Sequence, residues 1–241
     1  MKPSPNFDLL ARPYRWLEYL SFGPFLERAR FRFLPQIAAR LTSGPALILG
    51  DGDGRFTARL LTACPQLSID AVDLSPAMLA ALTRRAGPHA ARIATHCADA
   101  RLWQPAQSGY TLIATHFFLD CLSTPEVFEL AARLTPAAAP GALWLVSDFA
   151  TPPTLFGSLV ARPLVAALYL AFRLLTGLGA QSLPHHASAL AAAGWQRIAD
   201  QPHLAGLLVS ELWLNAGSPA AISQPPAHPP ESRTEHPSEP L

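Results

Sequence analysis

The chain has 241 residues, of which half are apolar and 15% are charged, and its formal net charge is +1. This length is ample for one globular domain with a large buried core. The near-neutral charge offers no basic surface for phosphate backbones, so no nucleic-acid partner is expected.

The termini and the cysteines carry little functional signal. Lys2 leads into Pro3 and Pro5 rather than into an apolar run, so no signal peptide is expected and a cytoplasmic location follows by default. The cysteines are odd in number and lack metal-ligand spacing, and we expect them to be reduced and mostly buried: Cys64, Cys97 and Cys121. No metal site is predicted.

Residues 1–44 are predicted to form a helical cap ahead of the main domain. Apolar residues at helical spacing indicate one helix before Gly23-Pro24 and a second one after it, kinked at Pro35. The arginines of the second helix are expected on a solvated face: Arg28, Arg30 and Arg32.

Residues 45–215 alternate between strand and helix patterns, which predicts an α/β fold with a doubly wound, mostly parallel sheet. Strands are expected over residues 46–49, 67–72, 92–97, 110–115, 142–149, 195–199 and 207–214. Helices are expected over residues 55–63, 77–85, 123–134 and 185–193. Because only a short turn joins the last two strands, they must be antiparallel.

Two segments depart from this alternation. A helical insert is predicted over about 152–193, and within it residues 155–175 carry only Arg162 and Arg173 as charges. The two arginines and Pro163 make this stretch a poor membrane-spanning candidate, so a packed or substrate-lining helix is favoured over contact with a membrane surface. Residues 216–241 contain seven prolines and no aromatic residue, which predicts a disordered tail.

Polar residues and glycines gather where the predicted strands end. In parallel sheets these carboxyl ends meet at one edge, where ligands bind. The residues concerned are Gly50 to Gly54, Asp73, Asp99-Ala100, Thr115-His116 and Asp148. The alternating glycines accept positive φ and let a ligand approach bare backbone, while the following helix turns its free N–H groups toward that ligand.

These residues resemble the motifs of class I S-adenosylmethionine-dependent methyltransferases. Gly50-Asp51-Gly52-Asp53-Gly54 is similar to the glycine-rich first motif, residues 71–79 to the second and residues 98–100 to the third. The resemblance spans roughly residues 6–214. It implies a Rossmann-like, seven-stranded sheet with an antiparallel last strand, S-adenosyl-L-methionine as cofactor and a small-molecule acceptor.

The resemblance also implies roles for single residues. Asp73 is placed to accept both ribose hydroxyls, and Asp99 to accept from the adenine amino group. The full set of implied cofactor-binding residues is Gly50, Asp51, Gly52, Gly54, Asp73, Leu74, Met78, Asp99, Ala100, Thr115 and His116.

Two positions discriminate within this reading. Ile48 stands where the family often has an acidic residue. The cofactor's amino group must therefore be bound by Asp51, by Asp53 or by backbone carbonyls. Arg55 stands where a nicotinamide-binding GxGxxG motif needs its last glycine, which disfavours a dehydrogenase.

Catalysis by in-line methyl transfer needs chiefly alignment, and a general base only where the nucleophile carries a proton. His116 is the first candidate because its ordinary pKa suits the task, and Asp120 is the second. A structural histidine beside the cofactor is the alternative reading of His116. The candidate substrate-binding residues are Tyr14, Phe117, Phe118 and Asp148, and ordinary core packing is the alternative for each aromatic ring.

The resulting hypothesis is a methyltransferase acting on a small, apolar or aromatic acceptor. Two alternatives stay open at this point. One is a methyltransferase-like protein that binds the cofactor without turnover, and the other is a peripheral membrane protein that uses residues 155–175.

Overall fold

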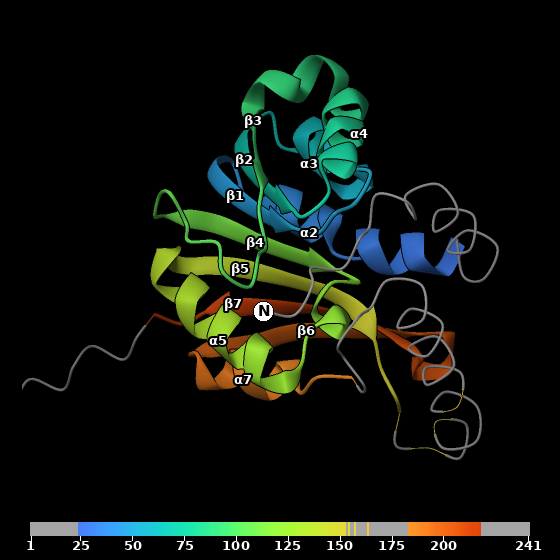
Figure 1. Cartoon of the computed structure of the whole chain (residues 1–241). Coiled ribbons are helices and arrows are strands. Elements are labelled where there is room, and N and C mark those ends of the chain that lie inside the picture. The colour runs from blue at the N-terminus through green and yellow to red at the C-terminus, as the bar shows by residue number, and fades with distance from the viewer. Residues whose placement is uncertain (1–23, 153, 155–156, 158–162, 164–182, 218–241) are drawn as a thin grey trace, which may run out of the picture.

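The computed structural model describes residues 24–152, 154, 157, 163 and 183–217. Tyr14, nearly all of residues 155–175 and the tail from residue 218 lie outside these residues. One seven-stranded sheet organises the described part, in the order β3-β2-β1-β4-β5-β7-β6 (Figure 1). The strands are β1 (Ser43–Leu49), β2 (Gln66–Asp73), β3 (Ile93–Cys97), β4 (Tyr110–His116), β5 (Ala138–Phe149), β6 (Trp195–His203) and β7 (Leu208–Asn215).

The expected doubly wound α/β fold is confirmed. The first five strands are parallel, whereas β7 runs antiparallel to both β5 and β6. The start of β7 therefore lies at the edge where the other strands end. The α-helices are α2 (Leu34–Arg40), α3 (Arg55–Ala63), α4 (Pro76–Ala86), α5 (Thr124–Leu134) and α7 (His186–Ala192). Short 3-10 turns are η1 (Gly87–Arg92), η2 (Leu119–Cys121), η3 (Thr135–Ala137) and η5 (Leu204–Gly206).

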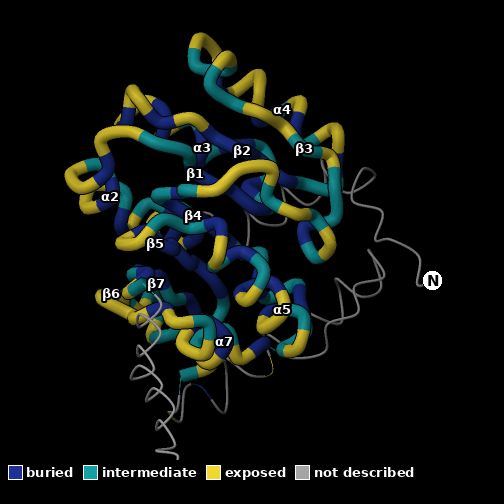
Figure 2. The backbone as a smooth tube through the Cα atoms, turned by 90° about the vertical axis from the view of Figure 1, so that its left-hand side faces the viewer, coloured by how far each residue is buried: buried dark blue, intermediate teal, exposed yellow. Residues whose placement is uncertain are grey.

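Alternating strand residues supply two hydrophobic layers, one on each face of the sheet. In β1, Ile48 packs with Phe56 and Leu60 of α3, whereas Leu47 belongs to the layer with Leu130 of α5. Figure 2 shows the result as buried central strands surrounded by helices with exposed outer surfaces. The period-2 alternation of the strands thus assigns each helix to one face.

The cap meets the edge of the sheet where the strands end. Residues 24–31 are helical, and a turn at residues 32–33 interrupts the helix before α2 begins. Pro35 therefore occupies the first turn of a new helix instead of kinking a single one. The buried carbonyl of Ala29 accepts hydrogen bonds from Ser147 Oγ (3.1 Å) and Ser210 Oγ (2.7 Å). These two hydroxyls come from the paired ends of β5 and β7.

The prediction of a solvated arginine face was wrong for one residue. Arg28 and Arg32 are exposed, but Arg30 is only 7% exposed. The helix that carries it packs against the sheet edge through Ala29, which turns the next side chain inward. Helical spacing alone identified the arginine positions but not which side the sheet would cover.

Other boundaries also shift. β5 begins at Ala138, within the expected loop, because Ala138 pairs with Tyr110 before an irregularity that includes Gly141 at φ 76°. Cys64 is buried as expected, whereas Cys97 at the end of β3 is exposed. Among the described residues, no helix has the length and apolar content needed to cross a membrane.

Loss of the cap contact should destabilise the fold measurably. We expect Ser147→Ala/Ser210→Ala to lower the free energy of unfolding by roughly 2 kcal/mol, because two buried hydrogen bonds to Ala29 disappear. Urea unfolding followed by circular dichroism measures this change. Ser188→Ala, an exposed serine on α7, is the matched control. Equal stability of the double variant and the control would contradict the proposed anchoring.

Candidate active site

The strand register brings the predicted residues into one row along the sheet edge. Gly50 N–H donates to Val72 O at 3.0 Å, which sets the glycine turn beside Asp73. Ala98 N–H donates to Asp73 O at 3.1 Å, so the third motif adjoins the second. On the other side of β1, Leu49 pairs with Thr115.

The three glycines of the turn have different steric surroundings. All have positive φ, at 65° for Gly50, 59° for Gly52 and 78° for Gly54. A Cβ on Gly50 would lie 2.5 Å from the Phe118 ring, and one on Gly54 would lie 2.6 Å from the backbone of Leu82 in α4. A Cβ on Gly52 would meet nothing within 4 Å. Gly52 is therefore the position that offers open backbone to a ligand.

Asp51 joins the turn to the start of α3. Its Oδ2 accepts from Thr57 N–H at 2.9 Å, a bond that also favours negative charge at a helix N-terminus. Its Oδ1 is buried and has no hydrogen-bond partner among the described residues. Burial raises the pKa of Asp51, while the nearby charge of Arg30 and the Thr57 bond oppose that rise. A buried acceptor oxygen beside open glycine backbone fits a ligand with a positively charged group.

The other candidates for the cofactor's amino group fit less well. Asp53 forms ion pairs with Arg85 at 2.7 Å and Arg55 at 3.3 Å. Ile48 is 1% exposed and belongs to the hydrophobic core. Of the side chains considered from the sequence, Asp51 remains the one with an acceptor oxygen to spare.

Asp73 and its neighbours shape the next part of the row. Asp73 is partly exposed at the end of β2, and its Oδ1 accepts from Ser75 N–H at 2.9 Å. Ser75 in turn caps α4 by accepting from Met78 N–H at 3.2 Å. Leu74 and Met78 are also partly exposed. Two apolar side chains and a carboxylate thus flank the start of α4, and their roles toward a cofactor stay a prediction.

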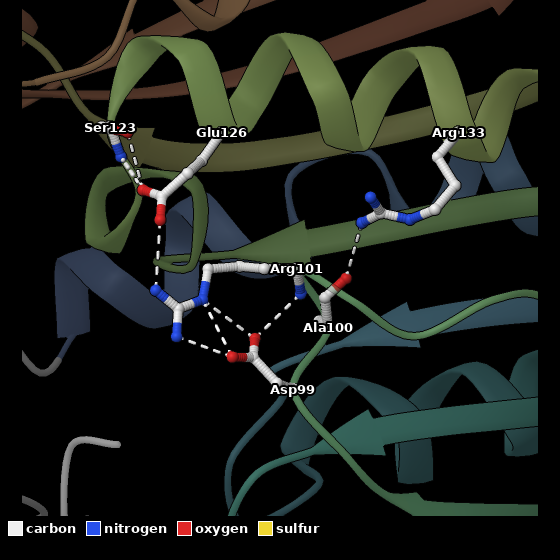
Figure 3. A network of polar contacts seen from close by, with 6 residues as sticks. All are labelled: Asp99, Ala100, Arg101, Ser123, Glu126 and Arg133. Atoms are coloured by element: carbon white, nitrogen blue, oxygen red, sulfur yellow. Dashed lines mark hydrogen bonds and ion pairs between the residues drawn. The ribbon is translucent and has the colours of Figure 1, made fainter. Parts of the chain in front are cut away.

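Asp99 is held by a residue that the sequence reading did not single out (Figure 3). Arg101 donates to Asp99 through its backbone N–H (2.9 Å), Nε (3.0 Å to each oxygen) and Nη2 (2.6 Å). These bonds lower the pKa of Asp99 and keep it ionised. Ala100 is buried, and its carbonyl accepts from Arg133 of α5 at 2.9 Å.

His116 and Thr115 at the end of β4 are both buried. Thr115 Oγ1 donates weakly to Leu145 O and accepts from Trp144 Nε1 at 3.2 Å, so the core engages this hydroxyl. The His116 ring stacks against Phe56 at 4.3 Å, and neither ring nitrogen has a hydrogen-bond partner among the described residues. Burial, reinforced by the charge of Arg30, lowers the pKa of His116 well below its ordinary value. The imidazole is neutral at physiological pH.

Asp120 and Asp148 form a carboxyl pair beyond the ends of β4 and β5. Asp148 accepts from Asp120 N–H at 3.1 Å and from Phe149 N–H at 2.9 Å. Burial raises the pKa of Asp120 to about 6, and burial together with the Asp120 charge raises that of Asp148 well above its usual range. Cys121 Sγ lies 3.5 Å from Asp120 Oδ1. The rise in pKa is the larger one for Asp148, because the neighbouring Asp120 charge adds to the effect of burial.

Two aromatic residues link this pair to the glycine turn. Phe117 has φ 52°, a left-handed conformation that is uncommon outside glycine, asparagine and aspartate. Its N–H donates to Ser147 O at 2.7 Å, and its ring lies 5.8 Å from Phe149 and 5.6 Å from the Arg30 guanidinium. Phe118 packs over Gly50. Both rings are partly exposed at the site, as their predicted role requires.

The sequence reading missed three contributors: Arg30, Arg101 and Cys121. A signal existed for Arg101 and Cys121, because they lie two residues and one residue from the predicted carboxylates Asp99 and Asp120. His186 pairs with Glu211 of β7 at 3.0 Å, and His185 is exposed and donates from its backbone N–H to Thr124 Oγ1 at 3.2 Å. No group of three or more histidine, cysteine or acidic residues among the described ones could hold a metal ion.

Comparisons with known proteins agree with this geometry. Residues 46–141 match the model of a methyltransferase domain. A 121-residue stretch is 36% identical to a trans-aconitate 2-methyltransferase of Streptomyces avermitilis, covering 49% of this chain and 42% of that protein. The chain thus spans less than half the length of this curated relative.

Solved structures share the fold at lower identity. An N-methyltransferase, NodS, from Bradyrhizobium japonicum in complex with S-adenosyl-L-homocysteine has a TM-score of 0.58 at 16% identity, covering 80% of this chain and 89% of that one. A structure described as a putative O-methyltransferase of Nostoc punctiforme has a TM-score of 0.66 at 18% identity, covering 88% and 61%.

The matched domain begins in β1 and runs through the glycine turn, Asp73 and Asp99 to the start of β5. Residues 46–141 are thus similar to a methyltransferase domain, and the fold around them is shared with solved methyltransferase structures.

Proposed function

We propose that this protein transfers a methyl group from S-adenosyl-L-methionine to a small acceptor with an apolar or aromatic body. The observation that carries the proposal is the row at the sheet edge, where the open backbone of Gly52 stands beside Asp51 and Asp73. The match of residues 46–141 to a methyltransferase domain supports the cofactor, and the rings that follow β4 support the kind of acceptor.

The proposed cofactor contacts follow the row. Asp51 Oδ1 meets the positively charged end of the methionyl part, Asp73 accepts from the ribose hydroxyls, and the segment at Asp99 borders the adenine. Leu74 and Met78 pack against the adenine faces. The bound cofactor supplies a methyl group already activated by its sulfonium, so the protein's task is mainly alignment and exclusion of water.

Asp120 is proposed as the proton acceptor in preference to His116. Asp120 is partly exposed, whereas His116 is 2% exposed and packed on Phe56. A proton taken up by His116 would create a buried cation near Arg30, which is costly. Asp120 is ionised above its raised pKa of about 6, and its backbone N–H donates to the Asp148 carboxyl group, which holds the residue in place.

The acceptor is proposed to be an organic molecule whose nucleophilic atom carries a proton. Phe117, Phe118 and Phe149 offer an apolar wall next to Asp120, which suits a flat or aliphatic body rather than a polypeptide or a nucleic acid. The similar proteins include a trans-aconitate methyltransferase and structures of N- and O-methyltransferases, which is consistent with a small-molecule acceptor. Turnover on any such acceptor would separate this proposal from binding without catalysis.

Removal of the Asp73 carboxylate should weaken cofactor binding. We expect Asp73→Ala to reduce the binding free energy for S-adenosyl-L-homocysteine by roughly 2 kcal/mol, because hydrogen bonds to a charged acceptor are lost. Isothermal titration calorimetry measures the change. Asp200→Ala, an exposed acid on β6, is the matched control and should bind like the unchanged protein. Equal affinity of both variants would show that the ribose site is elsewhere.

The carboxyl pair should set the pH dependence of turnover. Since Asp120 accepts a proton only when ionised, kcat/KM is expected to rise as the pH increases through about 6 and then to level off. Asp120→Asn should lower kcat by on the order of 100-fold or more. Asp148→Asn, whose amide resembles the protonated carboxyl, should retain more activity. His116→Gln should leave the profile in place, and a profile that vanishes in this variant would transfer the role to His116.

A further inference from the structure

Arg101 lies in the loop that follows β3, and its side chain contacts both Asp99 in that loop and Glu126 of α5. Its guanidinium faces Asp99 with one edge and Glu126 of α5 with another nitrogen, Nη1, at 3.1 Å (Figure 3). Glu126 completes a capping box, since its Oε2 accepts from Ser123 N–H (2.8 Å) and Ser123 Oγ (2.7 Å). Arg101 thus ties the loop after β3 to the N-terminus of α5.

The contacts leave Asp99 with a defined remaining capacity. An ionised carboxylate offers about four acceptor sites. Three N–H groups of Arg101 point at it: the backbone N–H, Nε–H and one Nη2–H. About one site is left for a further donor, and the fork of the guanidinium fixes the plane of the carboxylate and hence the direction of that site.

We propose that Arg101 is a positioning residue that orients Asp99 to accept a single hydrogen bond from the 6-amino group of the adenine ring. This inference rests on the proposed function, because it takes the loop at Asp99 to border the adenine. Without the guanidinium, Asp99 would keep only the bond from the backbone N–H of residue 101, and its carboxylate could turn about that bond toward water. Arg101 itself does not touch the cofactor in this proposal.

The charge balance supports the same role. The Arg101 bonds keep the pKa of Asp99 low, so the carboxylate stays an acceptor throughout the neutral range. Burial disfavours the charge of Glu126, but the bonds from Ser123 together with the bond and charge of Arg101 outweigh it and lower the pKa of Glu126. Arg101 is therefore held between two anions, which restrains its own side chain.

The test compares two ligands that differ at one group. S-adenosyl-L-homocysteine and its analogue with hydrogen in place of the 6-amino group are titrated calorimetrically into the full chain. The unchanged protein is expected to prefer the amino ligand by about tenfold, the value of one ordinary hydrogen bond. In Arg101→Ala this preference should fall toward one, and Arg101→Lys should restore part of it.

Arg133→Ala is the matched control. The Arg133 side chain also donates to this loop, but to the carbonyls of Ala100 (2.9 Å) and Trp103 (3.1 Å) rather than to the Asp99 carboxylate. Its loss should lower the affinity for both ligands alike and leave the preference unchanged. The Asp99→Asn/Arg101→Ala variant should show no further loss of preference beyond Asp99→Asn alone.

The outcomes separate the two levels of the argument. If the unchanged protein fails to bind S-adenosyl-L-homocysteine, the proposed function falls and takes this inference with it. If it binds and Arg101→Ala keeps the full preference for the amino ligand, only the inference is overturned. An equal drop of the preference in Arg133→Ala would also overturn it, because loop stiffness would then account for the effect.

Discussion

The whole site depends on how sharply the chain turns between β1 and α3. Five residues carry it from a buried strand to a helix, and three of them adopt positive φ. Gly50 leaves room for Phe118 and Gly54 for α4, so two of the glycines serve packing, while the backbone of Gly52 faces open space. The turn thereby brings Phe118, α4 and the open backbone of Gly52 close together. A side chain at either packing position would move one of these parts.

The acids along the sheet edge are stabilised in three different ways. Asp51 accepts from a helix N-terminus, Asp99 is paired with an arginine, and the pKa of Asp120 is raised by burial beside Asp148. The arginine lowers the pKa of Asp99, whereas burial raises that of Asp120 to about 6. Under the proposed function, cofactor binding and proton transfer would therefore use separate carboxylates within one row.

Local patterns were sufficient to predict the fold, because strand alternation, helix caps and glycine turns are encoded over a few residues. The same holds for Asp73, whose place follows from the end of β2. Pairings between distant residues were not predictable in this way. Asp120 contacts Asp148, which lies 28 residues further along the chain. The burial of Arg30 depends on where the cap helix packs against β5 and β7. One-dimensional periodicity carries no information about such contacts.

Phe117 has a consequence for the way this protein can change. A left-handed backbone at a bulky residue costs on the order of 1 kcal/mol, and glycine or asparagine would relieve it. The ring nevertheless stands between Arg30 and Phe149, contacts that neither smaller residue can supply. A search for thermostable variants would therefore favour glycine or asparagine in place of Phe117, and that change would remove the ring contacts beside the site. At Phe117, the residue that follows β4, stability and function thus favour different side chains.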